Sequence, residues 1–362
     1  MTHPTISPPR AWAEISFSAL KHNLDFIRSH SNQAVMAVLK AGAYGHGIEQ
    51  IALALESENL AYFGVASVIE ARKITQAGIQ TPIYLLGPTF HEERAEVIEN
   101  GWTPSISSLE EAEDFNRLAS ASKINVVHIT LDTGMGRGGF LPAALDTAID
   151  KITQLPNIKI EGIGSHLPSA DEDRAFTLRQ FATFEAAVKD KPFKYIHLSN
   201  SAGLLDYSSD STNLVRPGLM LYGISPIASY QQMLQPVMTL KSRVSLIRTL
   251  PAGHGISYGR DAILKKDTRV ATIGAGYGDG YPRAISNNGA EVFIRNQRCP
   301  VLGRVTMDQI MVDVSDLPLC ESGDEVELFG SNILVSEIAE KAHTIAWEVL
   351  TGITPRVTRT YQ

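Results

Sequence analysis

The chain has 362 residues, a length that suits one large domain followed by a second. Hydrophobic residues make up 44% and charged residues 20%, which excludes the class of disordered proteins. The formal net charge of −7 argues against a general nucleic-acid binder, because such a protein needs a basic surface for the phosphates. The two cysteines, Cys299 and Cys320, are too few for a disulfide framework or a cysteine zinc cluster.

The sequence also predicts where the protein works. It contains no run of about 18 apolar residues, so we expect no membrane span. The opening residues, 1–10, lack the apolar core of a signal peptide. We therefore expect a cytoplasmic enzyme.

Short apolar runs rich in β-branched residues predict eight strands in the first part of the chain. They are Ala34–Leu39, Tyr62–Val65, Ile83–Leu86, Pro104–Ile106, Val126–Leu131, Ile160–Ser165, Tyr195–Leu198 and Leu214–Val215. Stretches with apolar residues three and four apart lie between them and predict helices, among them Ile48–Leu55, Ile69–Ala77, Leu109–Leu118, Leu141–Ile152 and Phe176–Val188. Eight such units in about 200 residues indicate an α/β fold, the closed (β/α)8 TIM-type barrel. An open doubly wound sheet usually stops nearer to about six strands.

The pattern changes near Gln235–Pro236, after which helical periodicity disappears. We therefore place a barrel domain at residues 1–235 and a mostly β C-terminal domain at residues 236–362. The early run Ala11–Ile15 precedes the first barrel strand and is a candidate to pair with the β domain instead. Strands of the β domain are predicted at Val237–Ile247, Thr268–Ile273, Glu291–Ile294, Met311–Val314 and Glu325–Leu328.

Lys40 follows the first barrel strand directly, and a run of small residues and glycines comes after it. The carboxyl ends of barrel strands build the active site. Burial there would lower the pKa of Lys40, which suits a lysine that forms a Schiff base with a carbonyl cofactor. For an isolated lysine, the alternative is an ordinary side chain that reaches from a strand end into solvent.

Other strand ends are polar as well. Arg137 lies in the loop after the fifth strand, His166 follows the sixth, and Ser201 follows the seventh. Phosphate sites of these barrels usually lie in the loops after strands seven and eight. There Ser201 supplies a hydroxyl, and the backbone at Gly218–Leu219 can present N–H groups. A lysine, a phosphate cradle and the strand-end Arg216 at one rim together indicate pyridoxal phosphate.

Two other site types are disfavoured. The glycine-rich run Gly274–Gly280 resembles a dinucleotide-binding loop, but it lies in the β domain without the strand–helix context that such a loop requires. The ten histidines show no metal-ligand spacing, so we expect no metal.

Six motifs stand out along the chain. The barrel carries three of them, Ala37–Gly47, Leu131–Arg137 and His197–Ala202. The β domain adds Ile256–Gly259, Gly276–Arg283 and Gly303–Gln309. Together they resemble the motifs of the bacterial alanine racemases. The resemblance runs in the family's order from about Trp12 to Arg359, nearly the whole chain, and is more specific than any single motif.

The resemblance implies a pyridoxal 5′-phosphate enzyme that interconverts L- and D-alanine, supplies D-alanine for peptidoglycan, and shares its active sites across a head-to-tail homodimer. Lys40 looks like the Schiff-base lysine and the base for the D-isomer. Tyr258 of the partner subunit looks like the base for the L-isomer, and would need positive surroundings to act at neutral pH. Arg137 and the Met307 backbone N–H resemble contacts to the carboxylate of a small amino-acid substrate. The other implied cofactor contacts are Tyr44, Ser201, Gly218 and Leu219 at the phosphate, Asn200 beside them, and Arg216 at the ring nitrogen. His166 would link that arginine to a tyrosine, and His166 and Arg216 together would form the cationic surroundings that Tyr258 needs.

Three positions depart from the family's usual pattern. Gly42 stands where an aspartate is common, and Thr130 where many members have a carbamylated lysine that positions the substrate arginine. Pro355 replaces a tyrosine that narrows the entrance. These changes favour either ordinary family drift or a broader specificity that includes serine.

Two rival functions remain. A pyridoxal-phosphate decarboxylase of basic amino acids would have a carboxylate, not Arg216, at the ring nitrogen. A pyridoxal-phosphate carrier protein would resemble the barrel alone and would leave the β domain unexplained.

Overall fold

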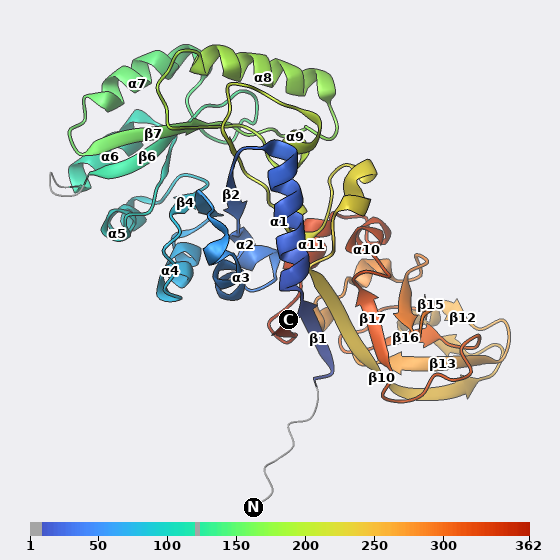
Figure 1. The fold of residues 1–362 in the computed structure, drawn as a ribbon. Coiled ribbons are helices and arrows are strands. Elements are labelled where there is room, and N and C mark those ends of the chain that lie inside the picture. The colour runs from blue at the N-terminus through green and yellow to red at the C-terminus, as the bar shows by residue number, and fades with distance from the viewer. Residues whose placement is uncertain (1–8, 120–123) are drawn as a thin grey trace, which may run out of the picture. The chain divides into compact units, whose positions relative to one another are not determined.

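The computed structural model describes residues 9–119 and 124–362 (Figure 1). Of the opening residues on which the signal-peptide expectation rests, 1–8 lie outside the described residues. The chain divides into two compact units, one made of Lys21–Ala43 and Gly47–Leu234, the other of the described residues up to Leu20, Tyr44–His46 and Gln235–Gln362. The sequence analysis placed one boundary at Gln235–Pro236, whereas this division also groups two earlier segments with the C-terminal unit.

The larger unit is built on parallel strands that alternate with helices. The strands are β2 (Ala34–Val38), β3 (Tyr62–Val65), β4 (Ile83–Leu85), β5 (Ser105–Ile106), β6 (Asn125–Thr130), β7 (Ile158–Gly164), β8 (Tyr195–His197) and β9 (Leu214–Val215). They form two four-stranded sheets in the orders β4-β3-β2-β9 and β5-β6-β7-β8. Backbone hydrogen bonds join the sheets on both sides, from Leu85 to Thr103 (2.9 Å) and from Arg216 to Ser199 (3.0 Å). The strands therefore close into a barrel, as predicted.

One helix precedes the first strand of this barrel, and the others connect successive strands. They are α1 (Phe17–Ser31), α2 (Lys40–Tyr44), α3 (Ile48–Leu55), α4 (Val68–Gln76), α5 (Arg94–Asn100), α6 (Leu109–Leu118), α7 (Leu145–Thr153), α8 (Arg174–Val188) and α9 (Ser201–Asp206). Serine side chains fix where two of them begin, because a hydroxyl can accept from an unpaired N–H of the first turn. Ser67 accepts from Glu70 N–H (3.3 Å) at α4, and Ser108 accepts from Glu111 N–H (3.1 Å) at α6.

The C-terminal unit is mostly β. Its strands are β1 (Ala11–Ile15), β10 (Met238–Leu250), β11 (Gly255–Ile256), β12 (Ala262–Ile263), β13 (Thr268–Ile273), β14 (Glu291–Ile294), β15 (Gln297–Leu302), β16 (Ile310–Asp313), β17 (Glu325–Phe329) and β18 (Thr358–Tyr361). A ring runs through β10, β13, β16, β15, β14 and β17 and returns to β10. The long β10 achieves this by pairing with β17 near its start and with β13 from Val244 onward, with a register shift between Val244 and Leu246. The early strand β1 pairs antiparallel with β10 and parallel with β18.

The expectation that helices end near residue 236 is wrong. The C-terminal unit contains the short helices α10 (Val335–Lys341) and α11 (Ala346–Thr351). Each spans about two turns, and so short a segment gives no clear helical periodicity in a window of 11 or more residues.

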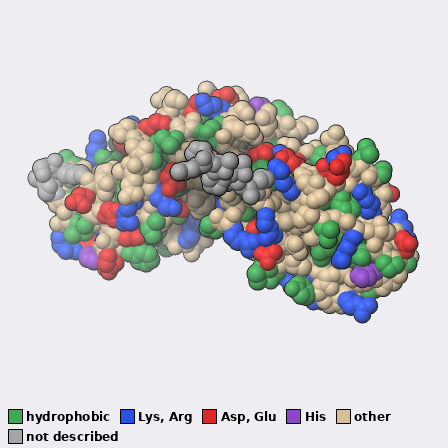
Figure 2. Space-filling view, turned by 90° about the horizontal axis from the view of Figure 1, so that it is seen from below, with side chains coloured by type: hydrophobic (Ala, Val, Ile, Leu, Met, Phe, Trp, Pro, Cys, Tyr) green, Lys and Arg blue, Asp and Glu red, His purple; other side chains and the backbone are tan. Residues whose placement is uncertain are grey.

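Two observations concern the helices and the surface charges of the described residues. Among the described residues, no helix combines the length and the apolar character needed to cross a membrane. On the face in Figure 2, outside the grey atoms, acidic and basic side chains are interspersed and form no basic stripe.

The glycine-rich run Gly274–Gly280 allows close approach of backbone segments within the C-terminal unit. A Cβ on Gly276 would lie 2.2 Å from Thr306 O, and a Cβ on Gly280 would lie 2.3 Å from Gly352 O. Gly280 also has a φ of +98°, a conformation that L side chains rarely adopt. The run therefore has a packing explanation and needs no nucleotide.

A side chain at Gly280 would destabilise the fold in two ways, through backbone strain at its positive φ and through the clash of its Cβ with Gly352 O. Gly280→Ala, compared with a control, separates the two effects. Gly323 is the matched control, because its φ is +97° and a Cβ there meets nothing within 4 Å. We expect Gly323→Ala to lower the free energy of unfolding by about 1 kcal/mol through backbone strain alone. Gly280→Ala should lower it by about 1–3 kcal/mol more, or prevent folding, because the clash is with backbone. Equal shifts in urea unfolding curves would contradict the packing explanation.

Candidate active site

The backbone that follows Lys40 turns through a rare conformation. Ala41, Gly42, Ala43 and Tyr44 have φ values of 54°, 64°, 55° and 53° in succession. The left-handed region costs a non-glycine residue roughly 1–2 kcal/mol, so three of these positions are strained. Such strain persists where the surrounding structure imposes it, and it clusters at functional sites. Apart from the glycine, nothing in the sequence indicates this turn.

Lys40 itself is half-buried in an electropositive environment. Burial lowers its pKa, and the nearby positive charge of Arg137 lowers it further, while Glu70 opposes both effects. Glu70 is fixed because its carboxylate accepts from the N–H groups of Ala66 (2.9 Å) and Gly42 (3.4 Å). A lysine with a lowered pKa has more neutral amine at neutral pH, and the neutral amine is the nucleophile and the base.

Arg216 is a buried cation whose acceptors are all neutral. Its side chain is 6% exposed. One terminal nitrogen donates to His197 Nδ1 (2.6 Å), and the other donates to Ser165 O (2.5 Å), Leu198 O (3.2 Å) and His166 Nδ1 (3.2 Å). Within residues 9–119 and 124–362, no carboxylate forms an ion pair with it. Burial lowers the pKa of Arg216 to about 10, so the group is still charged at neutral pH.

His166 is neutral, which corrects the cationic His166–Arg216 pair expected from the sequence. Burial lowers the pKa of His166 to about 3, helped by the charges of Arg216, Arg137 and Lys40. Because its Nδ1 accepts from Arg216, the ring proton is on Nε2. Arg216 therefore carries the charge of this pair alone.

The register of the barrel strands brings the loop after β9 beside Lys40. Ala34 pairs with Leu214 and Val35 with Val215 in the parallel β2–β9 ladder. One step further, Val38 N–H donates to Pro217 O (3.0 Å). Gly218 and Leu219 follow Pro217, so the predicted phosphate-binding backbone lies next to the strand that ends at Lys40.

Ser201, at the start of α9, is tied to this loop. Its hydroxyl oxygen accepts from the N–H groups of Gly218 (3.1 Å) and Met220 (3.3 Å). Both lone pairs are thus used, and the O–H proton remains to be donated, which suits an acceptor-only group such as a phosphate. Asn200 is the cap of α9. It accepts from Gly203 N–H (2.9 Å) and donates to Leu167 O (3.0 Å), and this cap is the role that the structure gives it.

Arg137 is exposed on a loop whose backbone is held by hydrogen bonds to the Asp132 carboxylate. Asp132 accepts from the N–H groups of Gly134, Met135 and Gly136 at 2.8–3.2 Å. Thr130, the predicted departure from the family, lies just before this loop and shares a 2.7 Å hydrogen bond with the Ser105 hydroxyl.

The remaining predicted residues belong to the C-terminal unit. Tyr44 is buried, and burial raises its pKa to about 12, so it is a neutral phenol. Tyr258 stands at the turn between β11 and β12 and is 70% exposed. Met307 is 52% exposed. Pro355 is flanked by Thr354, whose hydroxyl donates to Gly278 O (2.9 Å), and by Arg356, which pairs with Asp279 (3.2 Å).

Sequence reasoning missed the residues behind Arg216. His197 was noted only as part of a motif, and His128, Tyr62 and Glu161 were not singled out, although they form one hydrogen-bonded set with it. A polar residue within an apolar strand run, such as His128 in Asn125–Thr130, is the signal that could have revealed them.

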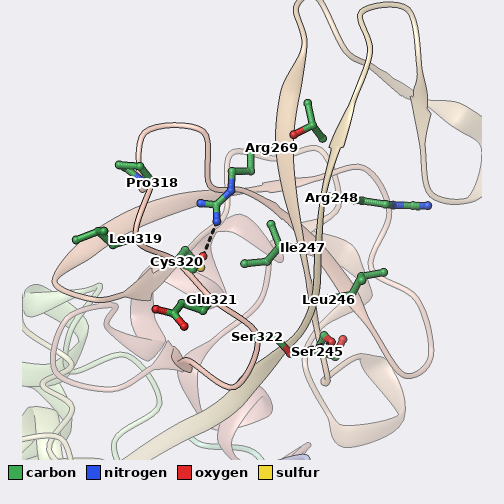
Figure 3. A pocket seen from close by; sticks show the side chains of 11 residues that line it. Ser245, Leu246, Ile247, Arg248, Arg269, Pro318, Leu319, Cys320, Glu321 and Ser322 are labelled. Carbon is green, nitrogen blue, oxygen red and sulfur yellow. Dashed lines mark hydrogen bonds between the residues drawn. The ribbon is translucent and has the colours of Figure 1, made fainter.

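A hollow of about 740 Å³ in the C-terminal unit contains none of these residues (Figure 3). Arg269 is one of the residues that line it, and its side chain donates to Leu317 O (2.7 Å) and Cys320 O (2.5 Å). The described residues also hold no cluster of three or more histidine, cysteine or acidic side chains suited to a metal.

The charges around Lys40 predict opposite responses to two substitutions. Glu70→Gln removes a negative charge and should lower the pKa of Lys40, whereas Arg137→Gln removes a positive charge and should raise it. The pH midpoint of Lys40 acetylation in cofactor-free protein, followed by peptide mass spectrometry, measures both. High salt should weaken the Arg137 effect, because that side chain is exposed. Shifts of the same sign in both variants would contradict this electrostatic description.

Comparison with known proteins gives a consistent picture. The profile for the alanine racemase N-terminal domain matches residues 15–226, and that for the alanine racemase C-terminal domain matches residues 237–361. An alanine racemase of Halothermothrix orenii is 39% identical, over 100% of this chain and 98% of its own length. The solved alanine racemase of Clostridium difficile 630 superposes with a TM-score of 0.91 at 35% identity, covering 99% of this chain and 97% of its own. That of Bartonella henselae, described with covalently bound pyridoxal phosphate, has a TM-score of 0.90 at 30% identity, covering 98% of this chain and all of its own.

Proposed function

The chain belongs to the alanine racemase family, and from that membership we propose that it interconverts L- and D-alanine with pyridoxal 5′-phosphate as its cofactor. It is then an amino-acid racemase, an isomerase, with a TIM-type barrel and a C-terminal β domain, and we propose that the boundary between them along the chain lies at Gln235–Pro236. We further propose that it works in the cytoplasm and supplies D-alanine for peptidoglycan.

The residues at the barrel rim fit the proposed cofactor. Lys40 would hold its aldehyde carbon, since the amine is half-buried with a lowered pKa. Ser201 has an O–H proton to donate to the phosphate, beside the backbone of Gly218 and Leu219. Arg216 would donate to the ring nitrogen, with His166 beside it. The neutral phenol of Tyr44 is a further donor for the phosphate, and Asn200 supports the group indirectly by capping the helix that begins at Ser201.

The proposed reaction needs two bases on opposite faces of the substrate α-carbon. When bound, pyridoxal phosphate withdraws electrons from the attached amino acid and so acidifies the proton on that carbon. The neutral amine of Lys40 takes this proton from the D-isomer and becomes an ammonium. The phenol of Tyr258 from the partner subunit gives a proton to the other face, and the roles reverse for the L-isomer. Arg137 and the Met307 N–H hold the substrate carboxylate.

The observation that carries this proposal is the buried Arg216 with its neutral acceptors, near a lysine whose pKa is lowered. An arginine is always a donor, so a ring nitrogen facing it must accept and stays unprotonated. A decarboxylase would need a carboxylate at this point, and no acidic side chain pairs with Arg216 among the described residues. The second domain, matched over residues 237–361, argues against a carrier protein.

The exposure of Tyr258 and Met307 supports a homodimer with shared active sites. Both are large side chains of the C-terminal unit, 70% and 52% exposed, and the proposed function requires both at a substrate. A partner subunit is the source that the family resemblance implies. The proposed partners are thus a second copy of the chain and a small amino acid, with no nucleic acid or membrane.

Reduction with borohydride should attach the cofactor to Lys40. Lys194 is the matched control, because its pKa is raised by its bond to Glu161 and its amine is more fully protonated. We expect peptide mapping to find the label on Lys40 alone, and Lys40→Ala to lose alanine racemisation. Label on another lysine, or no racemisation by the unmodified protein in a chiral assay, would refute the assignment.

Mixing two inactive variants tests the shared site. Lys40→Ala and Tyr258→Phe each lack one base, but a heterodimer would contain one site with both. Random mixing gives half heterodimers, each with one intact site of two, so about a quarter of wild-type activity should return. No recovery after verified subunit exchange would show that Tyr258 acts within its own subunit or not at all.

A broader racemase that also accepts serine is the second candidate function, favoured by Pro355 and Thr130. The Thr130 hydroxyl is bonded to Ser105, and threonine cannot carry a carbamate, so the charge that many relatives place near the substrate arginine is missing. Pro355 has no aromatic ring or hydroxyl to narrow the entrance. An anion or an ordered water beside Arg137 would then take over its positioning.

We therefore expect measurable serine racemisation beside alanine, and a serine-to-alanine ratio that shifts towards alanine in Pro355→Tyr. An added hydroxyl is discriminated by only about 1–3 kcal/mol in an apolar pocket, so a modest widening can erase the preference. If the wild type turns over alanine alone and Pro355→Tyr changes nothing, the departures are drift.

A further inference from the structure

A continuous line of side chains crosses the barrel interior behind the proposed site. Arg216 donates to His197 Nδ1 at 2.6 Å, and His197 Nε2 lies 2.9 Å from His128 Nδ1. His128 Nε2 lies 3.4 Å from the Tyr62 hydroxyl, which donates to Glu161 Oε2 at 2.5 Å. Neither histidine is more than 2% exposed, so no bulk water competes for these contacts.

The two ends of the line fix the direction of every hydrogen bond in it. A guanidinium can only donate, so His197 Nδ1 must accept and the proton of that ring is on Nε2. His197 Nε2–H then donates to His128 Nδ1, which places the second ring proton on Nε2 as well. This proton points at the Tyr62 oxygen, and a carboxylate, which can only accept, takes the Tyr62 proton. If either histidine were cationic, its Nδ1–H would face another N–H donor, and that hydrogen bond would be lost.

The charges of the groups agree with this assignment. Burial lowers the pKa of His128 to about 3 despite the opposing charge of Glu161, and burial beside Arg216 holds the pKa of His197 well below its ordinary value. Burial and the Glu161 charge raise the pKa of Tyr62. Burial also acts to raise the pKa of Glu161, but the bonds from Tyr62 and Lys194 outweigh it and the net pKa is lowered. Three neutral groups thus separate a cation from an anion.

Strand β7 is shaped to accommodate both rings. A Cβ on Gly162 would lie 2.7 Å from the His128 ring, and a Cβ on Gly164 would lie 2.0 Å from the His197 ring. A register shift in the β6–β7 ladder leaves Glu161 as an extra residue between the paired Ile160 and Gly162. Such a bulge re-aims a side chain, and here the Glu161 carboxylate reaches Tyr62.

We propose that His128 is a positioning residue that fixes the tautomer of His197 and thereby keeps the His197 Nδ1 acceptor aimed at Arg216. The proposed function gives His128 no contact with cofactor or substrate. Without His128 Nδ1, the Nε2–H of His197 has no partner, and the tautomer with its proton on Nδ1 would turn a donor towards the arginine. The aligned dipoles of the two rings favour positive charge at Arg216 and negative charge at Glu161. The consequence for catalysis rests on the proposed function, whereas the tautomers do not.

The tautomers can be read by ¹⁵N NMR of protein labelled at the histidine ring nitrogens, with signals assigned by single substitutions. In the full-length wild type we expect His197 and His128 each to be neutral with the proton on Nε2, with or without the cofactor. A proton on Nδ1 of either ring would overturn the proposal, even if the protein racemises alanine. Correct tautomers in a protein without racemase activity would refute only the proposed function.

Three variants separate positioning from packing. His128→Asn keeps an oxygen acceptor near the Nδ1 position, His128→Leu removes it, and Tyr62→Phe cuts the line beyond His128. We expect His128→Leu to give a mixture of His197 tautomers, weaker cofactor binding, and a kcat about 10- to 100-fold lower at a similar KM. His128→Asn should retain the Nε2–H tautomer of His197 and most of kcat. Tyr62→Phe should leave the His197 tautomer unchanged.

Two results with these variants would contradict the proposal. If His128→Leu and His128→Asn lose stability to the same extent while the His197 tautomer and kcat stay at wild-type values, His128 is only a packing residue. If His128→Leu does not fold, a change of the His197 tautomer in His128→Asn overturns the proposal by itself.

Discussion

The arrangement of the barrel interior depends on one buried positive charge. Arg216 is almost fully enclosed, and burying an unpaired charge is costly unless hydrogen bonds replace the lost water. The structure supplies two backbone carbonyls and the Nδ1 atoms of His197 and His166. Because these acceptors are neutral, the positive potential at the rim is not cancelled. The same charge helps to lower the pKa of His166 and leaves an arginine, not an acid, for the ring nitrogen of the proposed cofactor.

The backbone around this charge is adapted at two places. Four successive residues with positive φ follow Lys40, and Glu70 binds the N–H of Gly42 within that turn. On the other side of the barrel interior, Gly162 and Gly164 leave room for the two imidazole rings that lead away from Arg216. Local strain and missing side chains reduce stability on their own. Strained backbone and side-chain-free glycines are expected where the position of a functional group matters more than the packing of a single segment.

Much of the fold and of the candidate site could be predicted from the sequence, because residues that follow the strands of a barrel lie together at one end of it. Apolar runs gave the strands, and residues that follow them, such as Lys40 and Arg216, share one rim whatever their distance in the chain. The protonation of His166 could not be read in this way, since it depends on burial and on charges from other strands. His128 was missed for a similar reason: a lone histidine in a strand gives no hint that its partner is His197. The short helices α10 and α11 lacked the length for a periodic signal.

The most direct test of the account is a neutron diffraction structure of the deuterium-exchanged protein, which locates the hydrogens on these groups in a single experiment. The account predicts a fully protonated Arg216 surrounded by neutral rings, with one deuteron on Nε2 and none on Nδ1 of His197, His128 and His166. It also predicts a deuteron between Tyr62 and Glu161 that is bound to the tyrosine oxygen. A deuteron on Nδ1 of His197 or His166 would contradict it, because Arg216 would then face donors and its buried charge would have lost the acceptors on which the site depends.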